Sequence, residues 1–368
     1  MAPENRARPA IVVQVFQMRC PRKISLISMC AALLFMPVTA AAQENVAGEE
    51  WTDMKLLGRS ISPGNKRRFS FIPDNSFETS YLNMPVFVTR GNASGPTLCV
   101  TAGVHGDELN GIEVARRVFA RTDPMTMRGT LIALPAINAA GVRSGNRNMS
   151  DRRDLNRAFP GRAGGSVAAL IAYEVFTDVL RHCGAVVDLH TASNNRANLP
   201  QVRADISDPE IRELAIHFGL GIVVAGAGPD GSLRREVAKS GIPAIIYEAG
   251  EPHRFQAEEI DRGVEGVENV MAFFDMIDRE DREIPGARVY ERSRWVRAPR
   301  GFGGFFFPIA SLGDVVAKGE ILGKIVDPFT DESLDLSSPI DGEIIGMSVS
   351  QPVLSGYALF HVAWHDED

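Results

Sequence analysis

The chain has 368 residues, of which 45% are hydrophobic and 23% are charged, and its formal net charge is −7. This length is enough for more than one domain, and the ordinary composition excludes a fibrous or intrinsically disordered class. The acidic balance, with no long Lys/Arg-rich run after residue 42, argues against nucleic acid as a partner.

The N-terminal segment has the three parts of a signal peptide. Basic residues at positions 19, 22 and 23 precede an apolar run over residues 24–38, and small residues follow up to Ala42. The run is shorter than the ~20 residues that a membrane-spanning helix needs, so a cleaved signal is favoured over an uncleaved anchor. We expect residues 1–42 to be removed, which leaves a periplasmic or secreted protein without a stable membrane anchor.

From residue 95 the sequence alternates between apolar strands and helices. The expected strands are 96–102, 129–136, 185–190, 221–225 and 243–248, and the expected helices are 109–121, 165–182, 208–218, 232–240 and 256–279. Strands that alternate with helices predict an α/β fold with a mixed, mostly parallel, doubly wound sheet and helices on both faces. We expect residues 43–279, which begin with short lead-in strands, to form this domain.

The C-terminal part has a different pattern. Residues 280–296 are charged and contain Pro285-Gly286, so we interpret them as a linker. Short β-type runs with Gly and Pro then predict a small all-β domain over residues 287–365. The aromatic stretch 302–307 either packs this domain against the preceding one or forms a contact in a homo-oligomer, because contiguous exposed apolar surface is unusual.

Two cysteines, Cys99 and Cys183, follow the expected cleavage site. An oxidising compartment permits a disulfide, but Cys99 lies in the middle of an expected strand and Cys183 lies in a turn. We therefore interpret both as buried free thiols, with the disulfide as the alternative.

Two histidines and one carboxylate lie at the ends of expected strands. His105 and Glu108 share a short Gly-containing turn after strand 96–102, and His190 closes strand 185–190. Ligands in such sheets bind at the carboxyl ends of strands, and mixed His/Glu ligation with one open position is typical of catalytic zinc. We predict one Zn2+ per chain, held by these three residues. The alternative is that Asp107 and Glu108 only cap the expected helix 109–121, but it does not explain His105.

Three further groups are candidates for the chemistry. Glu248 ends a fully apolar strand, where a carboxylate is costly unless it is paired or functional, so we interpret it as the general base. Arg147 is a candidate for stabilising an oxyanion, and Asn156 with Arg157 is a candidate clamp for a carboxylate. Asp188 either orients a metal ligand or is a hydrogen-bonded turn residue, and both interpretations stay open.

Four ordered motifs resemble the succinylglutamate desuccinylase/aspartoacylase family, which has the zinc-carboxypeptidase-like fold. The motifs are His105-Gly106-Asp107-Glu108, the run from Asp154 to Gly161, Asp188-Leu189-His190-Thr191-Ala192 and Glu248-Ala249-Gly250. The resemblance extends over about residues 80–365.

This resemblance implies roles for the same residues. It implies a doubly wound sheet with one zinc held by His105, Glu108 and His190, Glu248 as the catalytic base, and a substrate carboxylate bound by the pair Asn156 and Arg157. Arg147 is the best match to the family's oxyanion arginine, and Arg152 is the competing candidate.

The C-terminal segment also resembles half-motifs of a biotinyl/lipoyl-like barrel, over residues 308–343. No lysine lies between Lys324 and the chain end, so the segment has no attachment site at the expected hairpin. It is expected to be an accessory domain and not a carrier.

Together these features predict a secreted zinc-dependent amidohydrolase that removes an acyl group from a small N-acyl amino acid with a free carboxylate. A zinc carboxypeptidase or peptidoglycan-peptide hydrolase, or an esterase that uses the same site, is the alternative. A non-catalytic binding protein would have lost a ligand or Glu248, whereas this sequence retains the complete set.

Overall fold

The structure is a computed structural model that describes residues 51–72, 83–193, 195–279 and 286–366. The chain divides into two units, Met1–Ala40 and Ala41–Asp368, and every described residue belongs to the second. The expected signal peptide lies outside the described residues and stays a prediction. Among the residues that are described, no helix has the length and apolar character needed to span a membrane.

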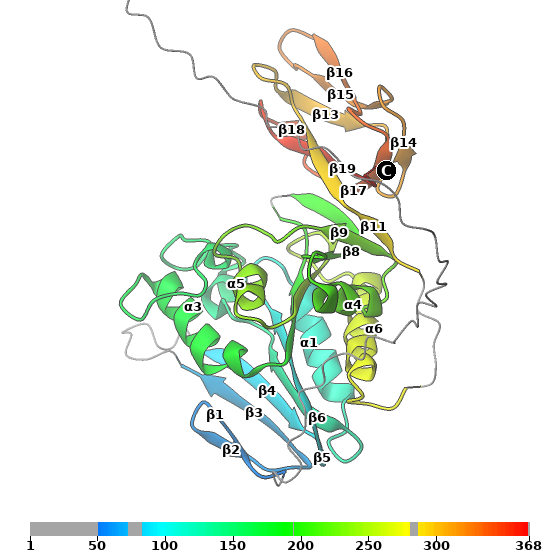
Figure 1. Ribbon diagram of the computed structural model, residues 1–368. Coiled ribbons are helices and arrows are strands. Elements are labelled where there is room, and N and C mark those ends of the chain that lie inside the picture. The colour runs from blue at the N-terminus through cyan, green and yellow to red at the C-terminus, as the bar shows by residue number, and fades with distance from the viewer. Residues whose placement is uncertain (1–50, 73–82, 194, 280–285, 367–368) are drawn as a thin grey trace, which may run out of the picture. The chain divides into compact units, whose positions relative to one another are not determined.

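A large mixed sheet organises the described chain (Figure 1). Its centre consists of four strands that pair in parallel in the order β6-β5-β7-β10. Their bounds are β5 (Ala93–Ala102), β6 (Arg128–Leu134), β7 (Ala185–His190) and β10 (Ala244–Gly250). The four central strands overlap strands expected from the sequence, and because they are parallel their carboxyl ends meet at one edge.

Toward the ends of the sheet the pairing changes. β4 (Met84–Arg90) pairs antiparallel with β6 and with β3 (Asn65–Phe71), and β8 (Arg196–Ala204) pairs antiparallel with β10. β9 (Ile222–Ala225) and β11 (Arg288–Tyr290) then follow β8 in parallel. The sheet is therefore mixed, with its parallel pairing concentrated at the centre. β1 (Met54–Leu56) and β2 (Arg59–Ile61) form a separate antiparallel pair.

Helices cover both faces of the central strands, as expected. α1 (Asn110–Arg121), α4 (Pro209–His217) and α6 (Ala257–Phe273) contribute to one buried apolar cluster, and α3 (Val167–Asp178) and α5 (Leu233–Lys239) contribute to a second. The neighbours Val186 and Val187 in β7 enter the second and the first cluster respectively, because successive side chains of a strand point to opposite faces. The remaining short helices are α2 (Ala139–Ser144), η1 (Leu155–Arg157) and η2 (Leu180–His182).

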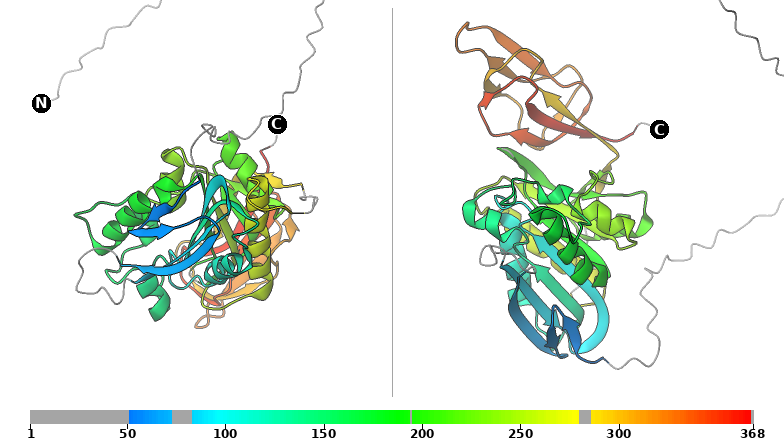
Figure 2. Two further views of the ribbon diagram at one scale, coloured as in Figure 1. Left: turned by 90° about the horizontal axis from the view of Figure 1, so that it is seen from below. Right: turned by 90° about the vertical axis from the view of Figure 1, so that its left-hand side faces the viewer.

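The C-terminal β domain is also present, and Figure 2 shows only strands in its described part. These strands are β12 (Arg292–Arg297), β13 (Gly304–Pro308), β14 (Val315–Val316), β15 (Ile321–Val326), β16 (Ser333–Ser337), β17 (Gly342–Ser348), β18 (Pro352–Val353) and β19 (Ala358–Trp364). β17 pairs antiparallel with β8, with Gly346 opposite Asn198, so this domain continues the large sheet.

Two segments of the C-terminal part differ from simple expectation. The stretch 280–296, expected as a linker, contains β11 and most of β12, in which charged side chains are exposed while Tyr290 and Val296 are buried. In the aromatic stretch, Phe306 packs in the domain's own core, whereas Phe305 and Phe307 are exposed. The exact domain boundaries stay predictions.

The interpretation of the cysteines as free thiols is wrong. Cys99 and Cys183 form a disulfide, with their Cα atoms 5.8 Å apart. β5 and β7 are neighbours in the sheet, and the amide of Gly184 donates to the carbonyl of Thr97, which brings the start of β7 alongside the middle of β5. This proximity is a product of the strand order, so it could not be read from two residues 84 positions apart.

Candidate metal centre and active site

The first motif forms a tight turn between β5 and α1. Gly103 has a φ of +59°, and a Cβ on Gly106 would lie 2.0 Å from the carbonyl carbon of Gly141 in α2. Only glycine fits so close a backbone contact. The turn directs His105 and Glu108 inward, where both are buried. α1 begins without a side-chain cap hydrogen bond, so the helix-cap alternative has no contact in its favour.

Three of the expected side chains converge. The potential ligand atoms of His105, Glu108 and His190 all lie within 4.8 Å of one another. Nδ1 of His105 is 2.7 Å from Oε1 of Glu108, and Nδ1 of His190 is 2.7 Å from Oε2 of the same carboxylate. The buried Nδ1 of His105 contacts this carboxylate without hydrogen-bond geometry, so it is an orphaned polar atom within the group of potential ligand atoms. The donor set of two imidazoles and one carboxylate fits zinc.

The opposite ring nitrogens of both histidines are held by carboxylates. Nε2 of His105 is 3.1 Å from Asp154, and Nε2 of His190 is 2.9 Å from Asp188. Asp188 also accepts a hydrogen bond of 2.7 Å from Thr101. Carboxylates in this position fix the ring tautomer and leave Nδ1 free for a ligand. The structure therefore favours the orienting role for Asp188, and it gives the same role to Asp154, to which no role was assigned from the sequence.

The electrostatics of the centre are dominated by these contacts. Burial alone would lower the pKa of His190, but Asp188 and Glu108 outweigh burial and raise this pKa well above its usual value. The pKa of His105 is raised for the same reason by Glu108 and Asp154 against the effect of burial. Burial raises the pKa of Glu108, but the two histidines hold it well below its usual range. Glu108 is thus an ionised carboxylate in a buried position.

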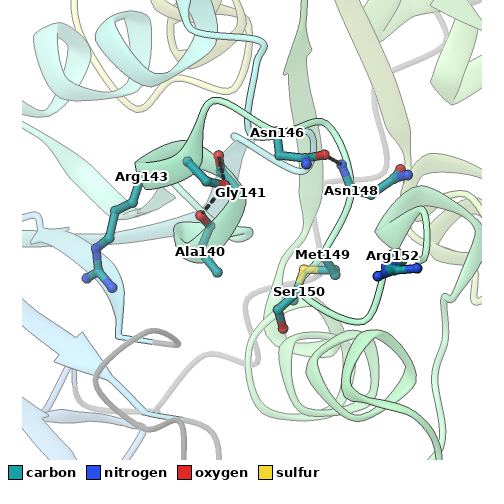
Figure 3. A pocket seen from close by; sticks show the side chains of 9 residues that line it. Ala140, Gly141, Arg143, Asn146, Asn148, Met149, Ser150 and Arg152 are labelled. Atoms are coloured by element: carbon teal, nitrogen blue, oxygen red, sulfur yellow. Dashed lines mark hydrogen bonds between the residues drawn. The ribbon is translucent and has the colours of Figure 1, made fainter.

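The two candidate oxyanion arginines lie in different places. Arg147 contacts Glu108 through Nη1 at 2.8 Å and Asp154 through Nη2 at 3.3 Å, so its guanidinium lies at the edge of the centre. Arg152 instead lines a pocket of about 510 Å³ beside α2 (Figure 3). The pocket is lined by Ala140, Gly141, Arg143, Ser144, Asn146, Asn148, Met149, Ser150 and Arg152. The geometry favours Arg147 for the oxyanion.

The expected carboxylate clamp is partly engaged in holding the fold. Oδ1 of Asn156 accepts a hydrogen bond of 2.8 Å from the amide of Leu233, the first residue of α5. Nη1 of Arg157 donates to the carbonyl of Asn156 at 2.6 Å, and the Arg157 side chain is otherwise exposed. The second motif therefore links the metal centre, through Asp154, to the start of α5.

Glu248 lies next to His190. The two residues are register partners on the adjacent parallel strands β10 and β7, so their side chains share one face of the sheet. Nδ2 of Asn198 in β8 donates a hydrogen bond of 2.6 Å to Oε2 of Glu248. Sequence reasoning missed Asn198 together with strand β8, although polar residues at 196, 198, 201 and 203 were a signal.

Strand β17 of the C-terminal domain pairs with β8 at Asn198. A Cβ on Gly346 of β17 would lie 2.9 Å from Oδ1 of Asn198. The backbone of β17 therefore restricts the amide that holds Glu248.

The comparisons with known proteins agree with this geometry. The family described as "Succinylglutamate desuccinylase/Aspartoacylase catalytic domain" matches residues 94–274. A curated relative, N-alpha-acetyl-L-2,4-diaminobutyric acid deacetylase of Halomonas elongata, is 25% identical over 279 residues, which cover 72% of this chain and 80% of the relative.

Solved structures extend the similarity over most of the chain. A succinylglutamate desuccinylase/aspartoacylase from Rhodobacter sphaeroides is 28% identical, with a TM-score of 0.73 over 84% of this chain and 98% of the other. The product-bound ectoine utilization protein of Ruegeria pomeroyi, at 22% identity and a TM-score of 0.75, covers 85% of this chain and 98% of its own. At that identity the likeness shows the shared fold alone.

Proposed function

This chain belongs to the succinylglutamate desuccinylase/aspartoacylase family, and from that premise we propose that it is a zinc-dependent amidohydrolase. Its substrate would be a small N-acyl amino acid with a free carboxylate. The observation that carries the proposal is the convergence of His105, Glu108 and His190, with Glu248 beside His190. The relative named as a deacetylase of an N-acetylated amino acid supports the reaction class.

The metal ligands would be His105, Glu108 and His190, with one zinc ion per chain. A divalent metal ion bound there lowers the pKa of a coordinated water and polarises the carbonyl of the scissile amide. Asp154 and Asp188 hold the two imidazole rings in the orientation that presents Nδ1.

The other side chains would transfer the proton, stabilise the oxyanion and bind the substrate carboxylate. The carboxylate of Glu248 takes a proton from the attacking water as its oxygen bonds to the carbonyl carbon, and returns that proton to the amide nitrogen as the C–N bond breaks. The products are a carboxylic acid and a free amine. The guanidinium of Arg147 stabilises the negative charge that develops on the carbonyl oxygen, and Asn156 with Arg157 would bind the carboxylate of the amino acid.

The C-terminal domain lies next to the proposed site. β17 pairs with β8 alongside Asn198, so the C-terminal domain adjoins the strand that borders Glu248. We further propose that the large sheet is of the zinc-carboxypeptidase type and that residues 287–365 are an accessory domain. The disulfide between Cys99 and Cys183 supports the proposal that residues 1–42 direct export, because disulfides persist in oxidising compartments.

The test is amine release by the zinc-loaded protein from N-acetyl, N-succinyl and longer N-acyl amino acids, with short peptides and esters as alternatives. Glu248→Gln keeps the shape of the side chain but cannot accept the proton, so it should retain zinc and lose about 10²- to 10⁴-fold in kcat. Glu251→Gln, which changes a partly exposed carboxylate paired with Arg254, is the matched control and should keep normal activity.

Each outcome assigns the reaction differently. Turnover restricted to N-acyl amino acids supports the deacylase proposal. Turnover of peptides alone would reassign the protein to the carboxypeptidases, and turnover of esters alone would make it an esterase. A fully active Glu248→Gln variant would remove Glu248 as the base.

A further inference from the structure

Arg152 has no role in the proposed reaction, because it lines the pocket beside α2 and not the metal centre. This pocket, here called the α2 pocket, has a volume of about 510 Å³, within the ~300–1,000 Å³ typical of small-molecule sites. The described residues that line it include neither the proposed metal ligands nor Glu248 or Arg157. The α2 pocket is therefore a second cavity, separate from the metal centre and large enough for a ligand.

The lining of the α2 pocket is positively charged. Arg143 and Arg152 lie on opposite sides of it (Figure 3), and its described lining contains no carboxylate. Asn146 and Asn148 add polar amide groups to the same lining. In a chain with a formal net charge of −7, a pocket with two cationic side chains and no anionic one favours an anionic ligand.

The neighbouring carboxylates do not neutralise Arg152. Asp151 pairs with Arg153 at 3.2 Å. Asp154 faces the metal centre, where it contacts Arg147 at 3.3 Å. Arg152 itself is exposed and forms no ion pair with the residues that the structure describes. Its charge is therefore available to a ligand in the α2 pocket.

The backbone of Arg152 is also unusual. Its φ is +65°, in the left-handed region that non-glycine residues seldom adopt. The turn is held by two hydrogen bonds of 2.9 Å, from the amide of Arg152 to the carbonyl of Met149 and from the amide of Met149 to the carbonyl of Arg153. Backbone strain of this kind is concentrated at functional sites. Here the strained residue contributes a positive charge to the α2 pocket.

The remaining lining is partly apolar. Met149 is buried, and Ala140 and Gly141 of α2 line the pocket with it. A ligand with an anionic group and an apolar body would match both parts of this lining. Carboxylates, sulfonates and phosphates share the oxygen geometry that a guanidinium binds through charge-assisted hydrogen bonds.

The segment that lines the α2 pocket also carries Arg147 of the metal centre. Asn146 and Asn148, which line the pocket, flank Arg147 in the chain. The backbone carbonyl of Arg147 accepts the amide of Gly106 at 3.4 Å, and its guanidinium contacts Glu108 at 2.8 Å. A ligand in the α2 pocket therefore touches the same loop that positions Arg147 for the proposed reaction.

We propose that the α2 pocket is an effector site for a small organic anion with an apolar body. The anionic group pairs with Arg152, the apolar body packs on Met149, and the bound ligand orders the loop 146–154. Because this loop carries Arg147, ordering it before the reaction raises kcat. Binding at the pocket does not depend on the reaction, whereas the effect on kcat rests on the proposed function.

The first experiment is calorimetric titration of the full zinc-loaded protein with benzenesulfonate and with methyl phenyl sulfone, its uncharged isostere. The sulfone should bind about 10- to 100-fold more weakly, the effect expected of charge-assisted hydrogen bonds. Arg152→Asn removes the guanidinium, and asparagine tolerates a left-handed backbone, so this variant should weaken benzenesulfonate binding by the same factor. Ser144→Phe, at an exposed lining position, fills the pocket without changing its charge and should abolish binding.

Two further variants locate the probe. Arg153→Asn changes the next residue, whose guanidinium pairs with Asp151 outside the described lining, and it should bind benzenesulfonate as the wild type does. Arg157→Met removes the cation of the proposed substrate clamp and should also bind normally. Binding that is lost in Arg157→Met and retained in Arg152→Asn would place the probe in the proposed active site and overturn the inference.

Hydrogen exchange measures the ordering of the loop without any turnover. Benzenesulfonate should slow amide exchange in residues 146–154 of the wild type and should have no such effect in Arg152→Asn. In active protein the same ligand should raise kcat for an N-acyl amino acid by about 2- to 30-fold. Slower exchange without a rise in kcat would overturn the effector role.

The outcomes separate this inference from the proposed function. Inactive protein that still shows Arg152-dependent binding and slower exchange would support the pocket as a binding site and overturn the deacylase reaction. Active protein that does not bind benzenesulfonate, or that binds it without slower exchange in the loop, would overturn the effector site and leave the deacylase proposal intact.

Discussion

Asn198 offers the sharpest test of how Glu248, the proposed base, is positioned. Its Nδ2 donates a hydrogen bond of 2.6 Å to Oε2 of Glu248, and the residue is buried against Gly346. A hydrogen bond to a charged group contributes about 1.5–3 kcal/mol, and each ~1.4 kcal/mol corresponds to a tenfold change in rate. Asn198→Ala should therefore lower kcat by about 10- to 150-fold, if the contact is needed to orient Glu248 in the transition state.

The assay is steady-state hydrolysis, together with zinc content and thermal stability. Asn198→Asp replaces the N–H donor with a like charge beside Glu248, so it should lower kcat further than Asn198→Ala does. A purely structural role for Asn198 would lower the stability of the variants without lowering kcat at full zinc content.

One result would contradict this role of Asn198. If Asn198→Ala retains wild-type kcat at full zinc content, the hydrogen bond does not position Glu248 for the reaction. A gentler variant tests the same link from the C-terminal domain, since Gly346→Ala would place a methyl group 2.9 Å from Oδ1 of Asn198. It should lower kcat in the same direction as Asn198→Ala.

Three further predictions concern the metal, the acid stability and the disulfide. His105→Ala should reduce bound zinc well below one per chain in elemental analysis, and full occupancy would remove it from the ligand set. Burial and then Arg203 lower the pKa of His361 to about 3, so the unfolded chain binds the proton first and the free energy of unfolding falls as the pH drops below about 6.5. Between pH 7 and pH 5 the free energy of unfolding, measured in urea titrations, should fall by about 2 kcal/mol because of His361. His361→Phe, which keeps a ring stacked on Trp295, should remove this contribution. An identical pH dependence in this variant would contradict the assignment to His361. Reduction of the Cys99–Cys183 disulfide, whose cysteines are 84 residues apart, should lower the free energy of unfolding by about 4 kcal/mol according to chain entropy, and unchanged urea midpoints with and without reductant would show that the bond does not form.

Much of the fold could be predicted from local sequence. The central strands β5, β6, β7 and β10 could be predicted because they are buried on both faces and so appear in the sequence as continuous apolar runs. The candidate ligand residues could be predicted because each lies at or just after the end of such a run. A polar residue at the carboxyl end of a parallel strand has a functional location in this class of sheet. The residues of the proposed site therefore depend on local sequence features and their order along the chain.

Other strands could not be predicted because many of their side chains are polar or exposed, so they form no apolar run. β8 carries Arg196, Asn198, Gln201 and Arg203, of which Asn198 and Arg203 contact Glu248 of β10, so it has no apolar run. The charged stretch before the C-terminal domain resembled a linker because β11 and β12 bury few side chains, Tyr290 and Val296 among them. A strand with a polar face cannot be distinguished from a loop by composition alone.

The sequence by itself determined the α/β class, the candidate ligand set and the candidate base, because these depend on residue types at the ends of apolar segments. Only the tertiary structure decided which distant groups meet. It joined Cys99 to Cys183 across adjacent strands and placed Asn198 on Glu248. Each of these contacts depends on strand order and register, which arise from packing of the whole chain and are not encoded in any short segment.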